Sequence, residues 1–197
     1  MGVYELSGAG SVKTGRTLYT SMNAGNQYGA MVPIATQVGT SSGVEILFSN
    51  IPATYQDLRL VISAIPSNAG TILGIYANQT TANTCSTTWL KGDGSSATSA
   101  RATGNIIIYP AGTNVTSTTI PTTYTLDVLS YTSTSTFKTV ITRTASDLNG
   151  SGYTTLSAGL IQTTNAINAL TLSTLNGGYF WTTNTTATLY GIRAVSS

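Results

Sequence analysis

The feature that most limits the fold of this chain is an alternation of apolar and polar residues with a period of two. In the segment 57–65, Leu58, Leu60 and Ile62 alternate with Arg59 and Ser63. Successive side chains of a β-strand point to opposite faces, so this pattern predicts a strand with one buried face. Similar β-rich runs occupy the segments 44–48, 71–78, 105–109, 122–130, 136–144, 153–161, 166–173 and 186–193.

Turn-forming residues separate these runs. They cluster at Asn50/Pro52, 66–68, 92–94, Asn149-Gly150 and 176–178. The segment 161–171 alone has the composition of a short helix, and we predict strand for most of it. Short strands between regular turn signals are typical of all-β folds. We therefore predict an antiparallel β-sandwich of jelly-roll type over residues 39–197.

The first 38 residues have little periodicity, yet they contain many apolar and aromatic side chains. A disordered tail is normally poor in such residues and rich in charge. We predict an extended N-terminal arm over residues 1–38 that lies on a neighbouring subunit; an arm folded back on its own domain is the alternative. The residues expected to make the contacts are Tyr4, Leu6, Leu18, Tyr19, Met22, Tyr28 and Met31.

The composition excludes several kinds of chemistry. The chain of 197 residues has no histidine and one cysteine, Cys85, so it lacks Ser-His-Asp and Cys-His catalytic pairs, imidazole metal ligands and an intrachain disulfide. We expect a small buried residue at Cys85, and no catalytic residues, metal or cofactor. The eight Lys and Arg residues are scattered, so no nucleic-acid partner is expected.

No membrane partner is expected either, because the longest apolar runs, such as Ile106-Ile107-Ile108, are far shorter than a membrane span. Residues 1–20 lack the basic and then apolar layout of a signal peptide.

Charged residues make up only 7% of the chain, whereas there are 38 threonines and 22 serines. Threonine is β-branched, and its hydroxyl keeps the outer face of a sheet polar without charge. Charge is the usual protection against association between sheet edges. A surface this poor in charge therefore indicates a protein that works inside an assembly.

Two groups of residues are candidates for a site. Asp127 and Asp147 are the carboxylates considered for glycosidase chemistry, which we disfavour because Asp127 faces outward and Asp147 lies beside a turn. Four aromatic residues at expected loops are candidates for an interface anchor or a carbohydrate platform. They are Trp89, Tyr179, Phe180 and Trp181; the alternative is that they cap the end of the core.

Four phrases of the sequence, in order, resemble those of a family of tailed-bacteriophage virion proteins described as head-decoration, minor tail or fibre proteins. The first is the phrase FSNIPATYQDLRL at 48–60, which is similar to the family's F-x-N-I-P-x-T-Y-x-D-L-x-L. The others are LKGDGSSATSAR at 90–101, the pair AGL at 158–160 and AINALTL at 166–172, and LYGIR at 189–193.

The resemblance implies an all-β, oligomeric virion protein without catalytic activity. We accordingly expect a capsid decoration or cement protein, assembled in the host cytoplasm and carried on the virion. Its expected partners are two further copies of itself in a homotrimer and the major capsid protein or other virion proteins. The alternative is a tail, baseplate or fibre component that binds host polysaccharide through the loop aromatics.

Overall fold

The structure is a computed structural model that describes residues 30–78, 85–104, 115, 117–175 and 179–194. Its described residues form strands joined by turns and loops, without a helix, which confirms the predicted all-β class. The strands are β1 (Met31–Val38), β2 (Glu45–Phe48), β3 (Asp57–Ala64), β4 (Leu73–Ala77), β5 (Cys85–Gly92), β6 (Ala97–Gly104), β7 (Thr122–Val128), β8 (Lys138–Asp147), β9 (Gly152–Ile161), β10 (Leu170–Thr174) and β11 (Thr186–Ile192).

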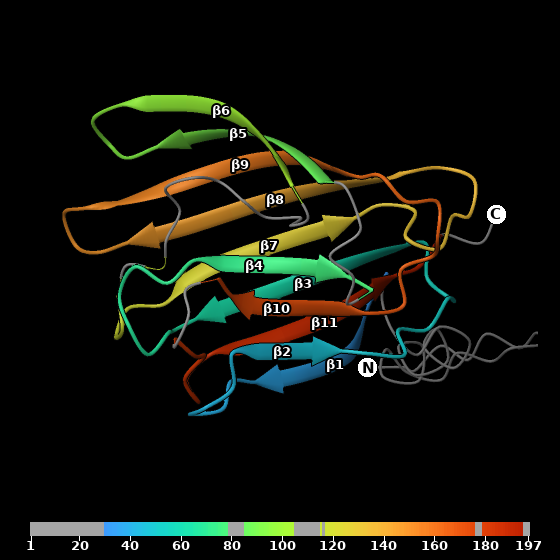
Figure 1. Ribbon diagram of the computed structural model, residues 1–197, viewed down its shortest axis with the longest axis horizontal. Coiled ribbons are helices and arrows are strands. Elements are labelled where there is room, and N and C mark those ends of the chain that lie inside the picture. The colour runs from blue at the N-terminus through green and yellow to red at the C-terminus, as the bar shows by residue number, and fades with distance from the viewer. Residues whose placement is uncertain (1–29, 79–84, 105–114, 116, 176–178, 195–197) are drawn as a thin grey trace, which may run out of the picture.

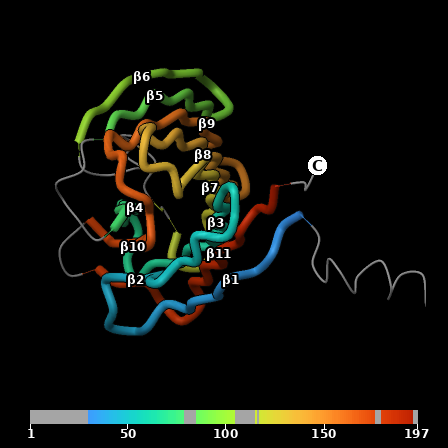
Figure 2. Tube along the Cα trace, turned by 90° about the vertical axis from the view of Figure 1, so that its right-hand side faces the viewer, coloured from blue at the N-terminus to red at the C-terminus, as the bar shows by residue number. Residues whose placement is uncertain are grey.

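The strands form two sheets (Figure 1). The larger has eight strands in the order β1-β11-β3-β7-β8-β9-β5-β6, and the smaller has three in the order β2-β10-β4. Every pairing within them is antiparallel, as the alternating pattern predicted. Figure 2 shows the larger sheet as an arc from β1 to β6, with β2, β4 and β10 inside the β1 end of the arc.

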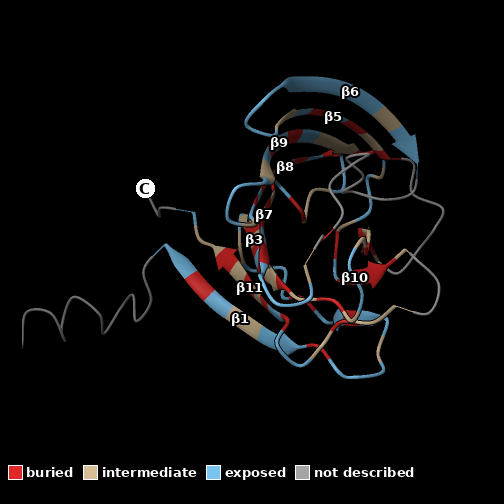
Figure 3. Cartoon of the chain, turned by 90° about the vertical axis from the view of Figure 1, so that its left-hand side faces the viewer, coloured by how far each residue is buried: buried red, intermediate tan, exposed pale blue. Residues whose placement is uncertain are grey.

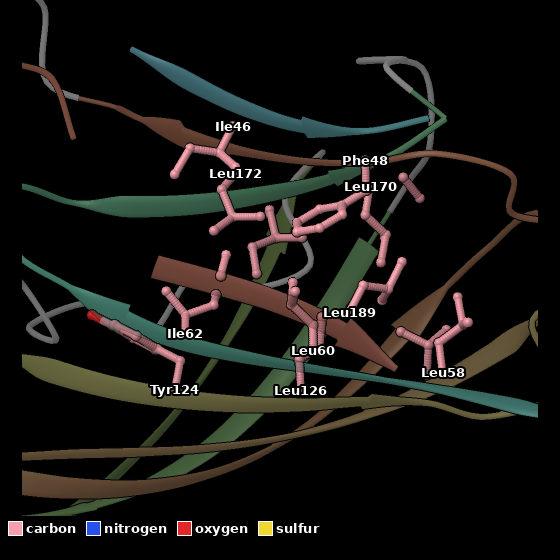
Figure 4. Close-up of a cluster of buried hydrophobic side chains, with 14 of the residues drawn as sticks. Ile46, Phe48, Leu58, Leu60, Ile62, Tyr124, Leu126, Leu170, Leu172 and Leu189 are labelled. Atoms are coloured by element: carbon pink, nitrogen blue, oxygen red, sulfur yellow. The ribbon is translucent and has the colours of Figure 1, made fainter. Parts of the chain in front are cut away.

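The apolar core lies between the smaller sheet and the part of the larger sheet that faces it. Leu58, Leu60 and Ile62 of β3 are at most 1% exposed, because their alternate positions all point to this side. Phe48 and Leu172 point toward them from the smaller sheet (Figure 4). Burial of such side chains stabilises the fold by about 1.5–3 kcal/mol each.

The inner face of the larger sheet becomes polar toward β6. Its buried positions on β8, β9 and β5 are occupied mostly by threonine and serine, where β3 has leucine. The hydroxyls of Thr144, Thr155 and Ser157 are buried and have no hydrogen-bond partner. The two ends of the larger sheet therefore differ in kind: one packs on the smaller sheet, and the other buries hydroxyls.

The start of the sheet differs from the sequence prediction. The structure places residues 31–38, predicted to belong to the arm, in β1, which pairs with β11. Only Val32 of this strand is buried, so backbone pairing and not an apolar face defines it, and the sequence pattern is weak there. The rest of the predicted arm, residues 1–29, lies outside the described residues, as does the predicted strand 105–109.

The segment 161–171 also differs from its prediction, because strand β10 begins only at Leu170 and residues 162–169 are neither helix nor strand. The side chain of Asn78 holds this segment. Its Nδ2 donates to the carbonyl of Ala166 at 2.9 Å, and its Oδ1 accepts from the amide of Asn168 at 2.9 Å.

Candidate interaction surface

The larger sheet has two outer edges, β1 and β6, and they differ in how they are protected. β1 carries Pro33 and an irregular register between Pro33 and Ala35, and both features oppose pairing with a further strand. β6 has the sequence ATSARATG, whose single charge is Arg101, and all of its residues except Ala102 are exposed. Figure 3 shows β6 as an exposed outermost strand, and no other described strand pairs with its outer side, so among the described strands it is the open edge of this sheet.

A hydrogen-bonded turn precedes β6. Oδ1 of Asp93 accepts hydrogen bonds from the backbone amides of Ser95 at 3.0 Å and Ser96 at 2.8 Å, and from both serine hydroxyls. These bonds favour the ionised carboxylate and hold the pKa of Asp93 far below its ordinary value. Gly94 adopts a φ of 87°, a conformation that glycine allows without strain.

An apolar hollow lies on the outer face of the sheet beside this edge. Leu90 of β5 and Leu156 of β9 lie directly opposite each other and are 56% and 52% exposed. Arg143 of β8 is the next residue in the same row. The hollow has a volume of about 480 Å³ and is lined by Leu90, Lys91, Gly92, Ala97, Arg143, Thr154, Thr155 and Leu156.

A second hollow, of about 490 Å³, lies between the tips of the β5–β6 and β8–β9 hairpins and shares Gly92 and Thr154 with the first. Tyr153 lines it, and the ammonium nitrogen of Lys91 lies 5.1 Å from the centre of the Tyr153 ring, a cation–π contact. Burial raises the pKa of Tyr153 to about 12. The phenol therefore stays neutral at physiological pH.

The two candidate carboxylates do not form a glycosidase pair. Asp127 accepts two hydrogen bonds from the guanidinium of Arg59, at 2.6 and 3.0 Å, and this ion pair raises the pKa of Arg59. Asp147 accepts from the amide of Asn149 at 2.9 Å, in the turn predicted from the sequence. Asp127 lies opposite Ile141 on β8, so Asp147 is about 20 Å further along the sheet, beyond the roughly 5–10 Å that glycosidases use.

The tryptophans are not at the surface. Trp181 is 1% exposed and forms an isolated bridge with Pro66, and Trp89 is 8% exposed at an inward position of β5. Both indoles are packed inside the chain, and Trp181 belongs to the core cluster. Neither ring therefore offers an exposed face on which a sugar could stack. Tyr179 and Phe180 are half-buried beside Trp181.

Of the seven residues expected on the arm, Met31 is described and is 42% exposed at the start of β1. Tyr4, Leu6, Leu18, Tyr19, Met22 and Tyr28 lie outside the described residues.

The structure also places the residues that were considered for reactive or metal chemistry. Cys85 is 2% exposed on β5, as predicted, and burial raises the pKa of its thiol to about 11. In the described ranges, His, Cys, Asp and Glu residues do not gather in groups of three that could hold a metal ion. The same ranges contain no helix with the length and apolarity that crossing a membrane requires.

Comparisons with known proteins return no matching family model, no matching curated protein and no matching solved structure. The surface must therefore be interpreted from its own chemistry. Sequence reasoning missed the open edge because ATSARATG contains no apolar alternation, although the preceding Gly-Asp-Gly marks a hairpin turn.

Proposed function

We propose that this protein is a structural subunit of a bacteriophage virion, most simply a capsid decoration or cement protein. One observation carries the proposal: the larger sheet ends in the open strand β6, which has a single charge, and exposed Leu90 and Leu156 lie beside it. Such an edge is suited to contact with other subunits. The resemblance of the sequence phrases to virion proteins is the reason for proposing a virion as the assembly.

In this proposal residues 1–29 tether the domain to neighbouring subunits on the particle. Apolar burial stabilises contacts by roughly 25 cal/mol per Å², and many copies on one particle add their contacts together. The jelly-roll type of the sandwich and the homotrimer stay predictions from the sequence, and the proposal does not depend on either.

A tail or fibre component that binds host polysaccharide is the less favoured function. It depended on the four loop aromatics as exposed stacking surfaces, and the indoles of Trp89 and Trp181 are buried while Tyr179 and Phe180 are half-buried. Burial inside the chain removes the ring faces on which a sugar stacks.

The proposal predicts a virion-bound protein in many copies. Quantitative mass spectrometry of purified virions is expected to find hundreds of copies in each particle. Deletion of residues 1–29 is expected to abolish binding to particles that lack the protein, while circular dichroism of the truncated chain stays that of a β-protein. The deletion stops before Met31 because β1 is part of the larger sheet.

The control is Thr139→Ala, an exposed position on β8, which is expected to bind particles normally. A handful of copies at the tail tip would favour the fibre function. Absence of the protein from virions would overturn the proposal, and undiminished occupancy by the truncated chain would overturn the tether.

A further inference from the structure

Strand β6 has few of the features that keep sheet edges apart. It contains no proline, its register with β5 is continuous from Ala97 to Gly104, and Arg101 is its single charged residue. Among the described residues, no strand pairs with its outer side. Because β1 at the opposite edge has both a proline and an irregular register, β6 is the edge at which a further strand is accommodated.

The hairpin geometry identifies the backbone groups that face outward. The amide of Asp93 donates to the carbonyl of Ser96 at 3.2 Å and closes the β5–β6 hairpin. In an antiparallel pair, hydrogen-bonded and non-hydrogen-bonded positions alternate. The even-numbered residues of β6 therefore bond to β5, and the amides and carbonyls of Ala97, Ser99, Arg101 and Thr103 point away from the sheet.

We propose that β6 pairs with β6 of a second copy, antiparallel, about a two-fold axis at Ala100. In this register Ser99 lies opposite Arg101 of the second copy, and Ala97 lies opposite Thr103. All the outward amides and carbonyls of both strands then form hydrogen bonds, and the outer faces of the two sheets stay on the same side. The two eight-stranded sheets become one.

Two neighbouring registers are less favourable. An axis at Arg101 places two guanidinium groups directly opposite each other, and like charges in that position destabilise a pair. An axis at Ser99 leaves Thr103 opposite the turn, beyond the end of the partner strand. An axis at Ala100 avoids both of these problems. It places the methyl groups of the two Ala100 residues opposite each other, at a non-hydrogen-bonded position where the two strands lie closest.

The side chains across this contact are small. Thr98 lies opposite Ala102 on the inner face, and the hydroxyl of Ser99 lies opposite the guanidinium of Arg101 on the outer face. The contact is independent of a virion, because it requires only purified protein. An experiment that rules out this dimer contact can therefore be told apart from one that rules out the proposed virion function.

Charge substitutions at Ser99 test the register in the full-length chain. Ser99→Lys places a cation opposite Arg101 at two symmetric positions and is expected to raise the dimer Kd about tenfold or more. Ser99→Asp is expected to lower it, and the double variant Ser99→Lys/Arg101→Asp is expected to restore it. Sedimentation velocity over a concentration series measures the Kd, and Thr139→Lys on β8, also exposed, is the matched control.

Amide hydrogen exchange tests the backbone pairing itself. The amides of Ala97, Ser99, Arg101 and Thr103 are expected to exchange more slowly as concentration rises, whereas those of Thr98 and Ala100 are protected at every concentration. A chain that stays monomeric at several hundred micromolar, or that associates with the odd-numbered amides still exchanging rapidly, overturns the proposal. So does a Ser99→Lys variant that dimerises as tightly as the original chain.

Discussion

The thiol of Cys85 shows how the interior controls a single reactive group. Burial raises its pKa to about 11 from an ordinary value of 9.0. At pH 8 the folded chain is therefore expected to react with a thiol reagent such as Ellman's at least tenfold more slowly than the unfolded chain, because the thiolate is the reacting species. Absorbance at constant pH, with and without denaturant, measures both rates.

The same pKa has a consequence for stability. Between pH 9 and 11 the unfolded thiol ionises while the folded one stays mostly protonated. Its contribution to the free energy of unfolding is therefore complete below pH 9 and lost as pH rises through about 11, about 3 kcal/mol in all. Cys85→Ala removes this part of the alkaline destabilisation. Equal slopes of stability against pH for the two chains would contradict the assignment.

Gly191 on β11 lies under the ring of Tyr55. A Cβ at this position would lie 2.2–2.4 Å from three ring carbons of Tyr55. Gly191→Ala is therefore expected to destabilise the fold by about 1–3 kcal/mol, measured by urea unfolding. In the Tyr55→Ala background the same substitution is expected to cost less than about 0.5 kcal/mol, and equal costs in the two backgrounds would exclude the contact.

Single residues were predictable where their chemistry is local. The turn at Asp147 and the buried thiol of Cys85 both followed from the sequence. The position of Trp181 did not, because an aromatic residue after Gly-Gly has the same local pattern whether it points into the core or outward. Trp181 forms a bridge with Pro66, which is distant in sequence, and packs into the core cluster.

At the scale of elements, Lys138 joins the start of β8 to two loops. The residue is fully buried, and its ammonium donates to the carbonyls of Ser133 at 2.5 Å, Thr136 at 3.2 Å and Thr163 at 3.1 Å. Lys138→Met leaves these carbonyls without their donor, so we expect a loss of about 3 kcal/mol and a Tm lower by roughly 6–12 °C.

Differential scanning calorimetry measures this loss. Arg143→Met is the control, since it removes a cation from the exposed face of the same strand and is expected to change Tm by less than about 2 °C. A Lys138→Met variant as stable as the control would show that the buried ammonium contributes nothing to the fold.

The strands themselves were predictable to different degrees. β3 and β7 have apolar residues on one face, so their alternation is visible in the sequence. β5 and β6 were not predicted. Cys85, Thr87 and Trp89 are buried on β5, but Leu90 points outward, and β6 has no apolar face.

At the scale of the whole molecule, the sequence pattern could not predict which strands pair with each other. Alternation states which face of a strand is buried but not which strand lies beside it. The position of β11 between β1 and β3 brings the two ends of the described chain together, and no local signal at either end indicates this.

That arrangement has a mechanical consequence. Met31 lies opposite Ile192, and the amide of Arg193 donates to the carbonyl of Ala30 at 2.9 Å. Force applied through the chain before Ala30 and the chain after Arg193 therefore acts across neighbouring strands at one end, and it separates β1 from β11 one bonded pair at a time. A subunit held at both ends yields by peeling at that corner, whereas one held only through its N-terminal side carries no tension across the sheet.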